Sequence, residues 1–520
     1  MNRFPSAAAG SILFALLFLF FLQLLTEFVA AIYAFGLLGT SIPAEIAAVL
    51  LLFSPLLLFL VPRGLSPLWL RLLLWLFLAT RALLPLLSTR GRMLVAGVGV
   101  ALFLFWLPAW LAQVARRRDA PAGLSWTFGA GLLLAVGTAT LLRALGAGLD
   151  ITTSGGLPLV AWGLVVVAAL LVPVLPLAEA DGEGRPAGGR RTWLVTAVLV
   201  AGLVAVLAQL YYGFAAPHVI ARWVARTPLW VLGVLSLAMA GWSIILFQPR
   251  WRAALTPRLL WLITLLFVLM LALTLEVQQV WFPPGPGGFP LREPAQPAWH
   301  GATVWATLLL APVLYADFVV LTAGLLARRP STAALAGAFG LASLMLLILI
   351  FAQVFTTVYD YIPFVGPIFR DHFWLVVPLP GFAVLLALLV TRDAGAGTVV
   401  IGREAWALPL LVLLLGAATV LVEFVRRPAL PAEAAGQPLR VLTYNIQQGY
   451  DEAGERAYAD QLAVLREADA DIIGLQESDT ARIAGGNDDL VRYFADELGY
   501  HSYYGPSPVV GTFGIALLSR

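Results

Sequence analysis

Long apolar runs dominate the chain, and short polar segments separate them. A helix needs about 20 predominantly apolar residues to cross a hydrocarbon core of about 30 Å. Residues 1–427 are therefore predicted to form a multi-span transmembrane region. About 13 spans are expected, at residues 11–35, 45–62, 68–88, 93–114, 122–145, 156–178, 192–214, 228–247, 257–277, 301–327, 332–354, 373–391 and 405–425.

The pattern changes after Arg427. Residues 428–438 are rich in proline and alanine and read as a linker. Residues 439–445 form a largely apolar run that predicts a buried strand, and residues 471–475 predict a second one. Between them, apolar positions recur at the spacing of one helix face. A further helix near residues 488–498 and a third strand near residues 513–519 complete the N-terminal part of an α/β sandwich at 439–520.

Composition sharpens this division. The chain is 61% hydrophobic and 12% charged, against roughly 25% charged residues in ordinary soluble domains, so a soluble globular enzyme is excluded. It has no cysteine, which removes disulfides, thiolate metal sites and a cysteine nucleophile. All 32 basic residues are arginine, so a Schiff-base lysine is excluded as well.

Charge is distributed unevenly. Residues 1–438 carry a net charge of +10 and residues 439–520 carry −7. With the N-terminus in the cytoplasm, 15 loop arginines lie inside and 9 outside, as the positive-inside rule favours. An odd span number then places the acidic C-terminal domain outside the cytoplasm. A nuclease is disfavoured, because this domain has no basic stripe to neutralise nucleic-acid phosphates.

Four ionisable residues fall at membrane depth: Glu27, Arg71, Arg81 and Asp317. Such groups are often functional because each needs a cavity or a partner. The plainer interpretation is that the arginines snorkel to the interface while the two acids tie helices together.

A polar and aromatic loop interrupts the apolar pattern at residues 355–372. Its Arg370 suits bidentate pairing with a phosphate, and its Asp360 suits a hydroxyl or an ammonium group. A lipid head group could bind here, although an interfacial aromatic belt followed by a turn explains the same residues.

Two polar residues follow the first two predicted strands of the C-terminal domain. Asn445 ends the first, and Glu477 lies just after the second. A carboxylate beside a carboxamide suits Mg²⁺ or Mn²⁺ rather than zinc. Taken alone, the pair is also ordinary for an α/β domain.

The residues around this pair resemble the first two motifs of the endonuclease/exonuclease/phosphatase superfamily, at residues 442–446 and 470–477. The resemblance implies a divalent-metal active site that includes Asn445 and Glu477.

One branch is more similar still, on residues 449–451, 477–479, 486–490, 505–507, 514–515 and 518–520. These resemble the GPI-anchor lipid-remodelling proteins, in which a multi-span region precedes such a domain. The branch pattern includes Asp451 and Asp479, which we expect to bind substrate.

The superfamily's domain has roughly 250 residues, ordinary for one domain, and its general-base histidine lies downstream of the last matched strand. Residues 439–520 cover only its first part, so the sequence is expected to be truncated and inactive as it stands. His501 comes too early to be that base and is predicted to be a surface residue.

Two functions remain open. The first is a membrane-anchored, metal-dependent hydrolase of phosphodiester or lipid-linked substrates, with a membrane lipid or glycolipid as substrate and no nucleic acid. The alternative is a non-enzymatic lipid handler or transporter whose tail binds or regulates.

Overall fold

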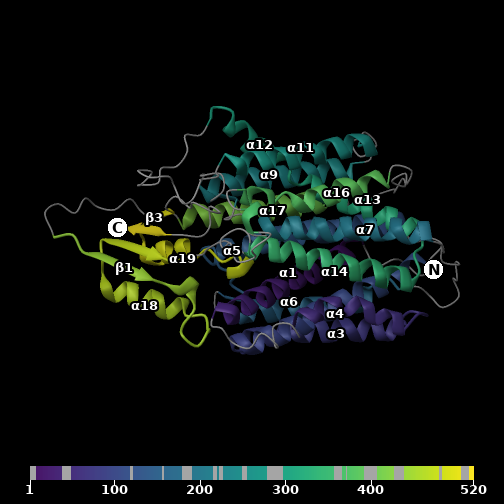
Figure 1. Ribbon diagram of the computed structural model, residues 1–520, viewed down its shortest axis with the longest axis horizontal. Coiled ribbons are helices and arrows are strands. Elements are labelled where there is room, and N and C mark those ends of the chain that lie inside the picture. Colours follow the sequence, from purple (N-terminus) through teal and green to yellow (C-terminus); the bar gives the residue numbers. More distant parts are fainter. Residues whose placement is uncertain are drawn as a thin grey trace.

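The computed structural model describes residues 7–37, 48–116, 121–154, 157–177, 190–214, 220–221, 227–248, 255–277, 297–355, 366–369, 372–391, 407–426, 438–478, 483–504 and 515–520. A helical bundle is followed by a small sheet that carries helices on one face. Figure 1 shows the two parts next to each other along the long axis, with α1 (Ala7–Leu37) beginning at the end of the bundle away from the sheet.

The other helical elements of the bundle are η1 (Leu51–Leu60), α3 (Pro67–Leu83), η2 (Leu84–Leu86), α4 (Thr89–Ala115), α5 (Pro121–Leu145), α6 (Pro158–Leu171), η3 (Val172–Val174), α7 (Arg190–Gln209), η4 (Leu210–Phe214), α9 (Pro228–Phe247), α11 (Pro257–Glu276), α12 (His300–Leu310), α13 (Val313–Ala327), α14 (Thr332–Phe355), α15 (Gly366–Phe369), η5 (Phe373–Leu375), α16 (Leu379–Leu389) and α17 (Ala407–Val425). Of these, η4 is a π-helical turn that continues α7.

Ten helices in the described residues are long and apolar enough to span a membrane. The chain is therefore a multi-pass membrane protein. The thirteen expected segments all contain helix, but three are shorter than predicted, at Ala48–Leu60, Pro158–Val174 and Leu379–Leu389. Proline explains part of the shortening, because Pro55 lies inside η1 and Pro173 lies inside η3, and an interior proline removes a helical hydrogen bond.

Helix starts in the bundle follow local sequence signals. Pro67 and Pro257 occupy the first turns of α3 and α11, where a missing N–H costs nothing. The preceding Ser66 and Thr256 accept hydrogen bonds from backbone N–H groups at the helix start. Short Ser-Pro and Thr-Pro steps therefore mark where these spans begin.

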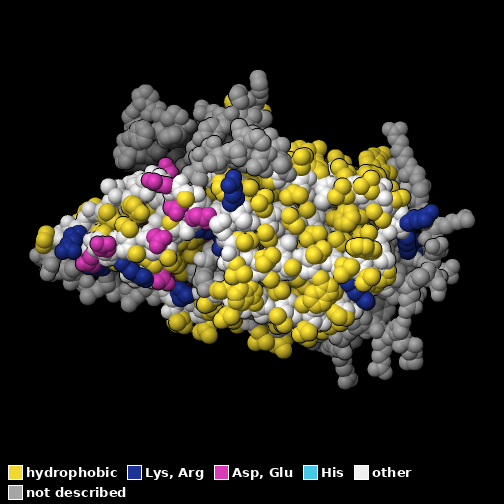
Figure 2. Space-filling view, turned by 90° about the horizontal axis from the view of Figure 1, so that it is seen from below, with side chains coloured by type: hydrophobic (Ala, Val, Ile, Leu, Met, Phe, Trp, Pro, Cys, Tyr) yellow, Lys and Arg dark blue, Asp and Glu magenta, His cyan; other side chains and the backbone are white. Residues whose placement is uncertain are grey.

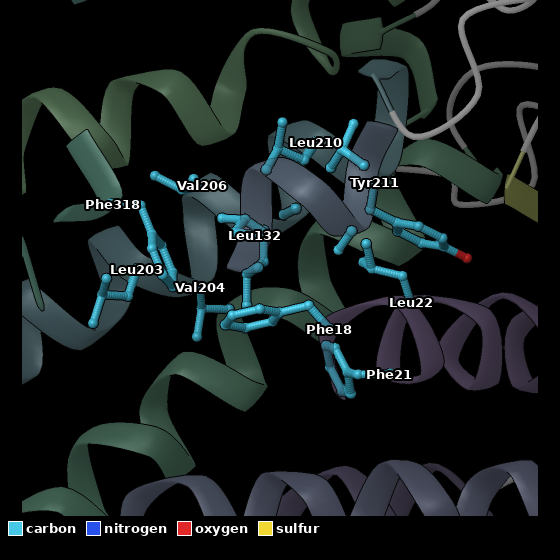
Figure 3. Packing of buried hydrophobic residues seen from close by; sticks show 14 of the residues in the cluster. Phe18, Phe21, Leu22, Leu132, Leu203, Val204, Val206, Leu210, Tyr211 and Phe318 are labelled. Carbon is cyan, nitrogen blue, oxygen red and sulfur yellow. The ribbon is translucent and has the colours of Figure 1, made fainter. Parts of the chain in front are cut away.

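Helix α1 runs through the centre of the bundle and is buried along nearly its whole length. Its Phe18 packs against Phe128 of α5 and Phe318 of α13, with ring centroids 4.8 and 5.6 Å apart. Its Phe21 stacks on Phe103 of α4 at 4.4 Å. Figure 3 shows Phe18 and Phe318 within this aromatic core, which joins segments far apart in sequence.

The outer surface of the bundle is apolar. In Figure 2, hydrophobic side chains cover its broad face, and the visible Asp and Glu side chains gather on the C-terminal domain. Exposed leucines occur on the outward faces of its helices, among them Leu237 of α9 and Leu414 of α17. A contiguous exposed apolar belt of this kind suits a lipid environment.

The C-terminal domain contains one mixed four-stranded sheet in the order β1-β2-β4-β3. β1 pairs with β2 in parallel, and both other pairings are antiparallel. Its elements are β1 (Val441–Asn445), η7 (Gln447–Gly449), α18 (Tyr458–Ala468), β2 (Ile472–Gln476), η8 (Ile483–Gly485), α19 (Leu490–Leu498), β3 (His501–Tyr504) and β4 (Ala516–Ser519).

Only one face of this sheet is covered in the described residues. Alternate side chains such as Ile473 and Leu518 are buried with α18 and α19, whereas Val441, Leu517 and Tyr503 on the other face are 67%, 45% and 53% exposed. The prediction that β1 is buried is therefore wrong, because β1 is an edge strand with one open face.

A further strand, β3, was absent from the sequence-based prediction. It holds His501, which is half-buried and pairs with Ser519 of β4 rather than standing on a free surface.

Candidate active site

The parallel pairing of β1 and β2 brings Asn445 and Glu477 to one edge of the sheet. Asn445 is directly opposite Gln476 in the strand register, so Glu477 follows by a single residue. Both Asn445 and Glu477 are exposed. Parallel strands end at the same edge of a sheet, so the sequence-based expectation that these residues lie at one edge agrees with the fold.

The backbone at this edge is unusual. Glu477, Gln447 and Gln448 have φ values of 48°, 45° and 57°, in the left-handed region that residues other than glycine rarely adopt. Backbone hydrogen bonds hold the turn, since Gln448 N donates to the Glu477 carbonyl at 3.1 Å. Strained backbone of this kind concentrates at functional sites.

Asn445 is oriented by its own turn. Its Oδ1 accepts a hydrogen bond from the backbone N–H of Gln447 at 2.9 Å. The amide Nδ2 remains as a donor on the exposed side chain, and Oδ1 retains a second lone pair. Asn445 can therefore present a fixed donor to a phosphate oxygen or an oxygen ligand to a cation.

This edge of the sheet is turned toward the helical bundle. Five residues after Asn445, the hydroxyl of Tyr450 donates to the Ala30 carbonyl of α1 at 3.5 Å. Ser478, directly after Glu477, is fully buried. Figure 1 shows the arrowhead of β1 pointing toward the bundle. The exposed pair is therefore close to the junction between the two parts of the protein.

Glu27 of α1 anchors this junction. It is 2% exposed and forms ion pairs with Arg456 at 2.9 Å and Arg92 of α4 at 3.3 Å. Burial lowers the pKa of Arg456, but the neighbouring Glu27 carboxylate outweighs it, so this pKa lies well above its ordinary value. An intramembrane carboxylate thus binds both a bundle helix and the C-terminal domain.

A second buried contact joins Asp488 to the bundle. Its carboxylate pairs with Arg143 of α5 at 3.1 Å and accepts from Ser154 at 2.8 Å and from Tyr458 at 3.3 Å. Burial raises the pKa of Asp488, although Arg143 and Arg456 act in the opposite direction. The preceding residues belong to the same contact, since Arg143 also donates to the Asn487 carbonyl at 2.8 Å.

The third contact involves α17, the last helix before the linker. Glu423 of α17 pairs with Arg492 of α19, and Arg492 also pairs with Asp496 at 3.4 Å. Burial raises the pKa of Asp496 to about 6, with Glu423 acting in the same direction and Arg492 opposing it. Three separate helices of the bundle therefore hold the domain through buried charges.

The remaining ionisable residues at membrane depth have partners or lie at the surface. Arg81 is fully buried and donates to Gln23 at 2.8 Å and to Thr152 at 2.9 Å. Asp317 accepts from Thr264 at 3.0 Å, and Arg71 is exposed. Helix-tying contacts thus account for Glu27 and Asp317, and surface exposure is consistent with snorkelling of Arg71. The expectation that Arg81 snorkels to the interface is wrong, because its side chain is fully buried among polar partners inside the bundle.

The donor set at Asn445 and Glu477 fits part of a divalent-metal shell. Mg²⁺ is typically bound by one or two carboxylates together with waters and substrate phosphates. One carboxylate and one amide oxygen meet the lower end of that requirement. No group of three or more Asp, Glu, His or Cys residues that could hold a metal occurs among the residues that the structure describes.

Other expected site residues are only partly placed. Asp451 is exposed, and its Oδ1 accepts backbone hydrogen bonds from Ala453 at 2.9 Å and Glu455 at 2.8 Å. This oxygen shapes the turn that leads to Arg456. Asp479, Arg370 and Asp360 lie outside the described residues.

Sequence reasoning missed the residues that dock the domain. Residues 486–490 were noted only as part of a family pattern, yet Asp488 lies in the buried junction. The available signal was Glu27, because an acid inside an apolar helix needs a cationic partner. Its partner Arg456 lies 429 residues away in sequence, a separation that no local pattern reveals.

The chain shares its C-terminal domain with known proteins. Residues 437–520 match the family model described as PGAP2IP, C-terminal nuclease-like domain. Protein cwh43 from Schizosaccharomyces pombe (strain 972 / ATCC 24843) is 45% identical over 56 residues, which are 11% of this chain and 6% of that protein. The chain therefore matches a small fraction of that relative's length and carries a nuclease-like domain of the PGAP2IP type.

Two solved structures cover most of the chain at low similarity. They are the inward-facing unoccupied and occupied forms of a bacterial homolog to the human lysosomal transporter Spinster. Both have a TM-score of 0.35 and 16% sequence identity. The match to the unoccupied form covers 81% of this chain and 96% of that chain. The match to the occupied form covers 80% of this chain and 94% of that chain.

Proposed function

We propose that this protein is a membrane-anchored, metal-dependent hydrolase that cleaves a phosphodiester in a membrane lipid or glycolipid, in the manner of the GPI-anchor lipid remodelers that it resembles. The observation that carries the proposal is the position of Asn445 and Glu477. They are exposed on the edge of the nuclease-like sheet that is turned toward the membrane-spanning bundle. In this proposal, a lipid head group reaches this edge from the bilayer surface.

In this proposal, Glu477 holds Mg²⁺ or Mn²⁺ through its carboxylate. When bound, such an ion polarises a phosphoryl oxygen and eases attack on the ester. Asn445, fixed by the Gln447 N–H, donates through Nδ2 to a phosphate oxygen or adds an oxygen ligand. The left-handed backbone at Glu477 carries a conformational cost, and both side chains remain exposed.

Substrate binding is assigned to residues around this pair. Asp451 has one carboxylate oxygen engaged by its own turn, and the other oxygen is available to head-group hydroxyls. We assign Asp479 to the same task because it follows Glu477 by two residues. Arg370 and Asp360, which precede α16 in the sequence, are proposed to bind a phosphate and a hydroxyl or ammonium group. No nucleic acid is expected as substrate.

We further propose that the chain crosses the membrane thirteen times, which places the C-terminal domain outside the cytoplasm. Helix α4 begins at the junction, where Thr89 donates to Glu455 at 2.8 Å. It ends near Arg116, which donates to the Arg63 carbonyl at 3.3 Å and to Thr332 at 3.2 Å. Arginines at the end away from the domain agree with a cytoplasmic position of that end.

The test uses the protein expressed from its complete reading frame, reconstituted in nanodiscs. Release of a phosphorylated head group from phosphatidylinositol or a glycosylated derivative should require Mg²⁺ or Mn²⁺ and should be lost on chelation. Glu477→Gln should abolish it, whereas Glu467→Gln, at an exposed site on α18, should not. Metal-independent release, or full activity in Glu477→Gln, would overturn the proposal.

A non-enzymatic lipid handler is the second candidate. A partly open pocket between helices of the bundle, with a mainly apolar lining, favours it. Lipid transfer between vesicles that is unaffected by Glu477→Gln and by chelation, with no head-group release, would support this function over the hydrolase.

A further inference from the structure

The pocket lies between α5, α9, α13 and α17, and the π-helical turn η4 closes one side. Seventeen residues line it, among them Leu133, Phe214, Leu235, Pro312 and Val412. The pocket is partly open, since its empty space of about 590 Å³ includes space that is open to the surroundings of the bundle. The π-turn matters because such turns recur at functional sites.

The lining is suited to hydrocarbon rather than to a polar ligand. Two of its few polar groups are the hydroxyls of Thr140 and Thr419, and both donate within their own helices. Thr140 donates to the Val136 carbonyl at 2.9 Å, and Thr419 donates to the Leu415 carbonyl at 2.8 Å. Hydroxyls used in this way offer no donor to an occupant.

One side of the pocket reaches the outer surface of the bundle. Gly137, Ser236, Met239 and Leu415 line it and are only half-buried. On the same two outer helices, α9 and α17, Leu237 is 67% exposed. Bilayer lipid is therefore the medium that meets this opening.

The opposite limit of the pocket is the domain junction. Thr140 precedes Arg143, which holds Asp488, by less than one helical turn. Thr419 precedes Glu423, which holds Arg492, by about one turn. A chain inserted from the bilayer therefore runs toward the contacts that dock the C-terminal domain.

The π-helical turn η4 contacts both the pocket and the C-terminal domain. Leu210 lines the pocket, while the carbonyl of the next residue, Tyr211, accepts from Asn487 of the C-terminal domain at 3.2 Å. Figure 3 shows the Tyr211 side chain directed away from Phe18 and Phe318. The pocket and the docked domain therefore share the same short segment.

We infer that this pocket binds one acyl chain of a membrane lipid and holds the head group of that lipid at the junction, beside the edge that carries Asn445 and Glu477. The inference rests on the proposed function only for the fate of the head group. The acyl chain is assigned to the pocket from the apolar lining and from the half-buried residues at its opening toward the bilayer.

Gly137 offers a direct way to block the opening. A Cβ built there would lie 3.5 Å from Leu415 Cδ1 and 3.8 Å from Met239 Cε, which is ordinary van der Waals contact. Gly137→Leu therefore places a side chain between two lining residues without a clash at its Cβ. Gly233→Leu on α9 is the matched control, because a Cβ at Gly233 meets nothing within 4 Å.

The experiment uses the full chain in nanodiscs of phosphatidylcholine that contain a fraction of phosphatidylcholine with a diazirine in one acyl chain. After irradiation, mass spectrometry maps the labelled residues. We expect Leu235, Met239 and Leu415 to be labelled more strongly than the outward-facing Leu237 and Leu414. In Gly137→Leu this excess should be lost, and in Gly233→Leu it should remain.

Gly137→Ala, which adds only the Cβ, keeps the test valid if the larger substitution fails to fold, and it should lower the excess partially. Equal labelling of lining and outward residues, or an unchanged excess in Gly137→Leu, would overturn the inference. Loss of the excess on adding cholesterol alone to the nanodiscs would overturn it as well. Labelling does not depend on hydrolysis or metal and should persist in Glu477→Gln. Pocket labelling without head-group release would therefore refute only the hydrolase.

Discussion

The C-terminal domain has ion pairs at both ends, and only those that face the bundle are buried. At the junction, the side chains of Glu27 and Arg456 are 2% and 13% exposed. At the opposite end, those of Arg440 and Asp469 are 67% and 57% exposed. Arginine–carboxylate pairs with similar N–O distances, 2.9 and 3.3 Å, therefore lie in two different environments.

Physical chemistry explains the difference. Removing one partner of a buried pair leaves an uncompensated charge and typically costs about 3–5 kcal/mol, whereas exposed pairs contribute roughly 0–1 kcal/mol. Buried pairs thus determine where the domain sits. Glu477 belongs to neither class, because it is exposed but lies on the side of the domain that faces the bundle.

The largest effect is expected for Glu27→Gln, which leaves Arg92 and Arg456 without their shared carboxylate. We expect docking to weaken by about 3–5 kcal/mol. Hydrogen exchange of residues 483–490, measured by mass spectrometry in detergent, should accelerate accordingly. Adding Arg456→Gln should recover part of the loss. A change below about 1 kcal/mol would place this pair with the exposed class.

Glu477→Gln should separate function from stability. In the complete protein, we expect turnover to fall by more than the roughly 10- to 100-fold typical of residues that only support a metal ligand. The unfolding midpoint should remain that of wild type, because the side chain is exposed. Parallel measurement of metal-dependent head-group release and thermal unfolding tests this, and a large loss of stability would contradict the assignment.

Asp496 should make stability depend on pH. Burial raises its pKa from 3.8 to about 6, so between these values the folded state binds more protons than the unfolded state. The stability that Asp496 contributes is therefore complete below about pH 4 and is lost as the pH rises through 6, by about 3 kcal/mol for a shift of this size. Unfolding in detergent from pH 4 to 7 should show this decline in wild type and a weaker one in Asp496→Asn. Equal slopes would exclude Asp496 as its source.

The smallest effect is expected at an exposed pair. Arg466 and Glu497 are 2.9 Å apart but 53% and 36% exposed. Arg466→Ala should therefore change the free energy of unfolding by less than about 1 kcal/mol, and 0.5 M salt should remove most of that difference. A change as large as that of Glu27→Gln would erase the distinction between the two ends of the domain.

The parts of the fold that follow a local pattern could be predicted from sequence. Apolar runs gave the helical segments, and the strand and helix periods gave β1, α18, β2 and α19 within a few residues. The family motifs led to Asn445 and Glu477, which the parallel register does place at one edge.

The remaining features depend on contacts between distant segments. β3 is short and polar at its start, and its pairing with β4 defines it. The junction joins Glu27 to Arg456 and Arg143 to Asp488 across more than 300 residues. Tertiary packing rather than local preference decides such pairs, so no periodicity could reveal them.

The central claim is that the edge of the domain proposed to bind metal faces the bundle, and Mn²⁺ can report on it directly. The chain has no cysteine, so a nitroxide can be attached at Leu86→Cys near the junction or at Leu60→Cys near the opposite end of α4. Both positions are exposed. In the complete protein, we predict that Mn²⁺ broadens the spectrum of the label at 86, that the label at 60 is unaffected, and that Glu477→Gln abolishes the broadening. Equal effects at both labels, or broadening that persists in Glu477→Gln, would contradict the account.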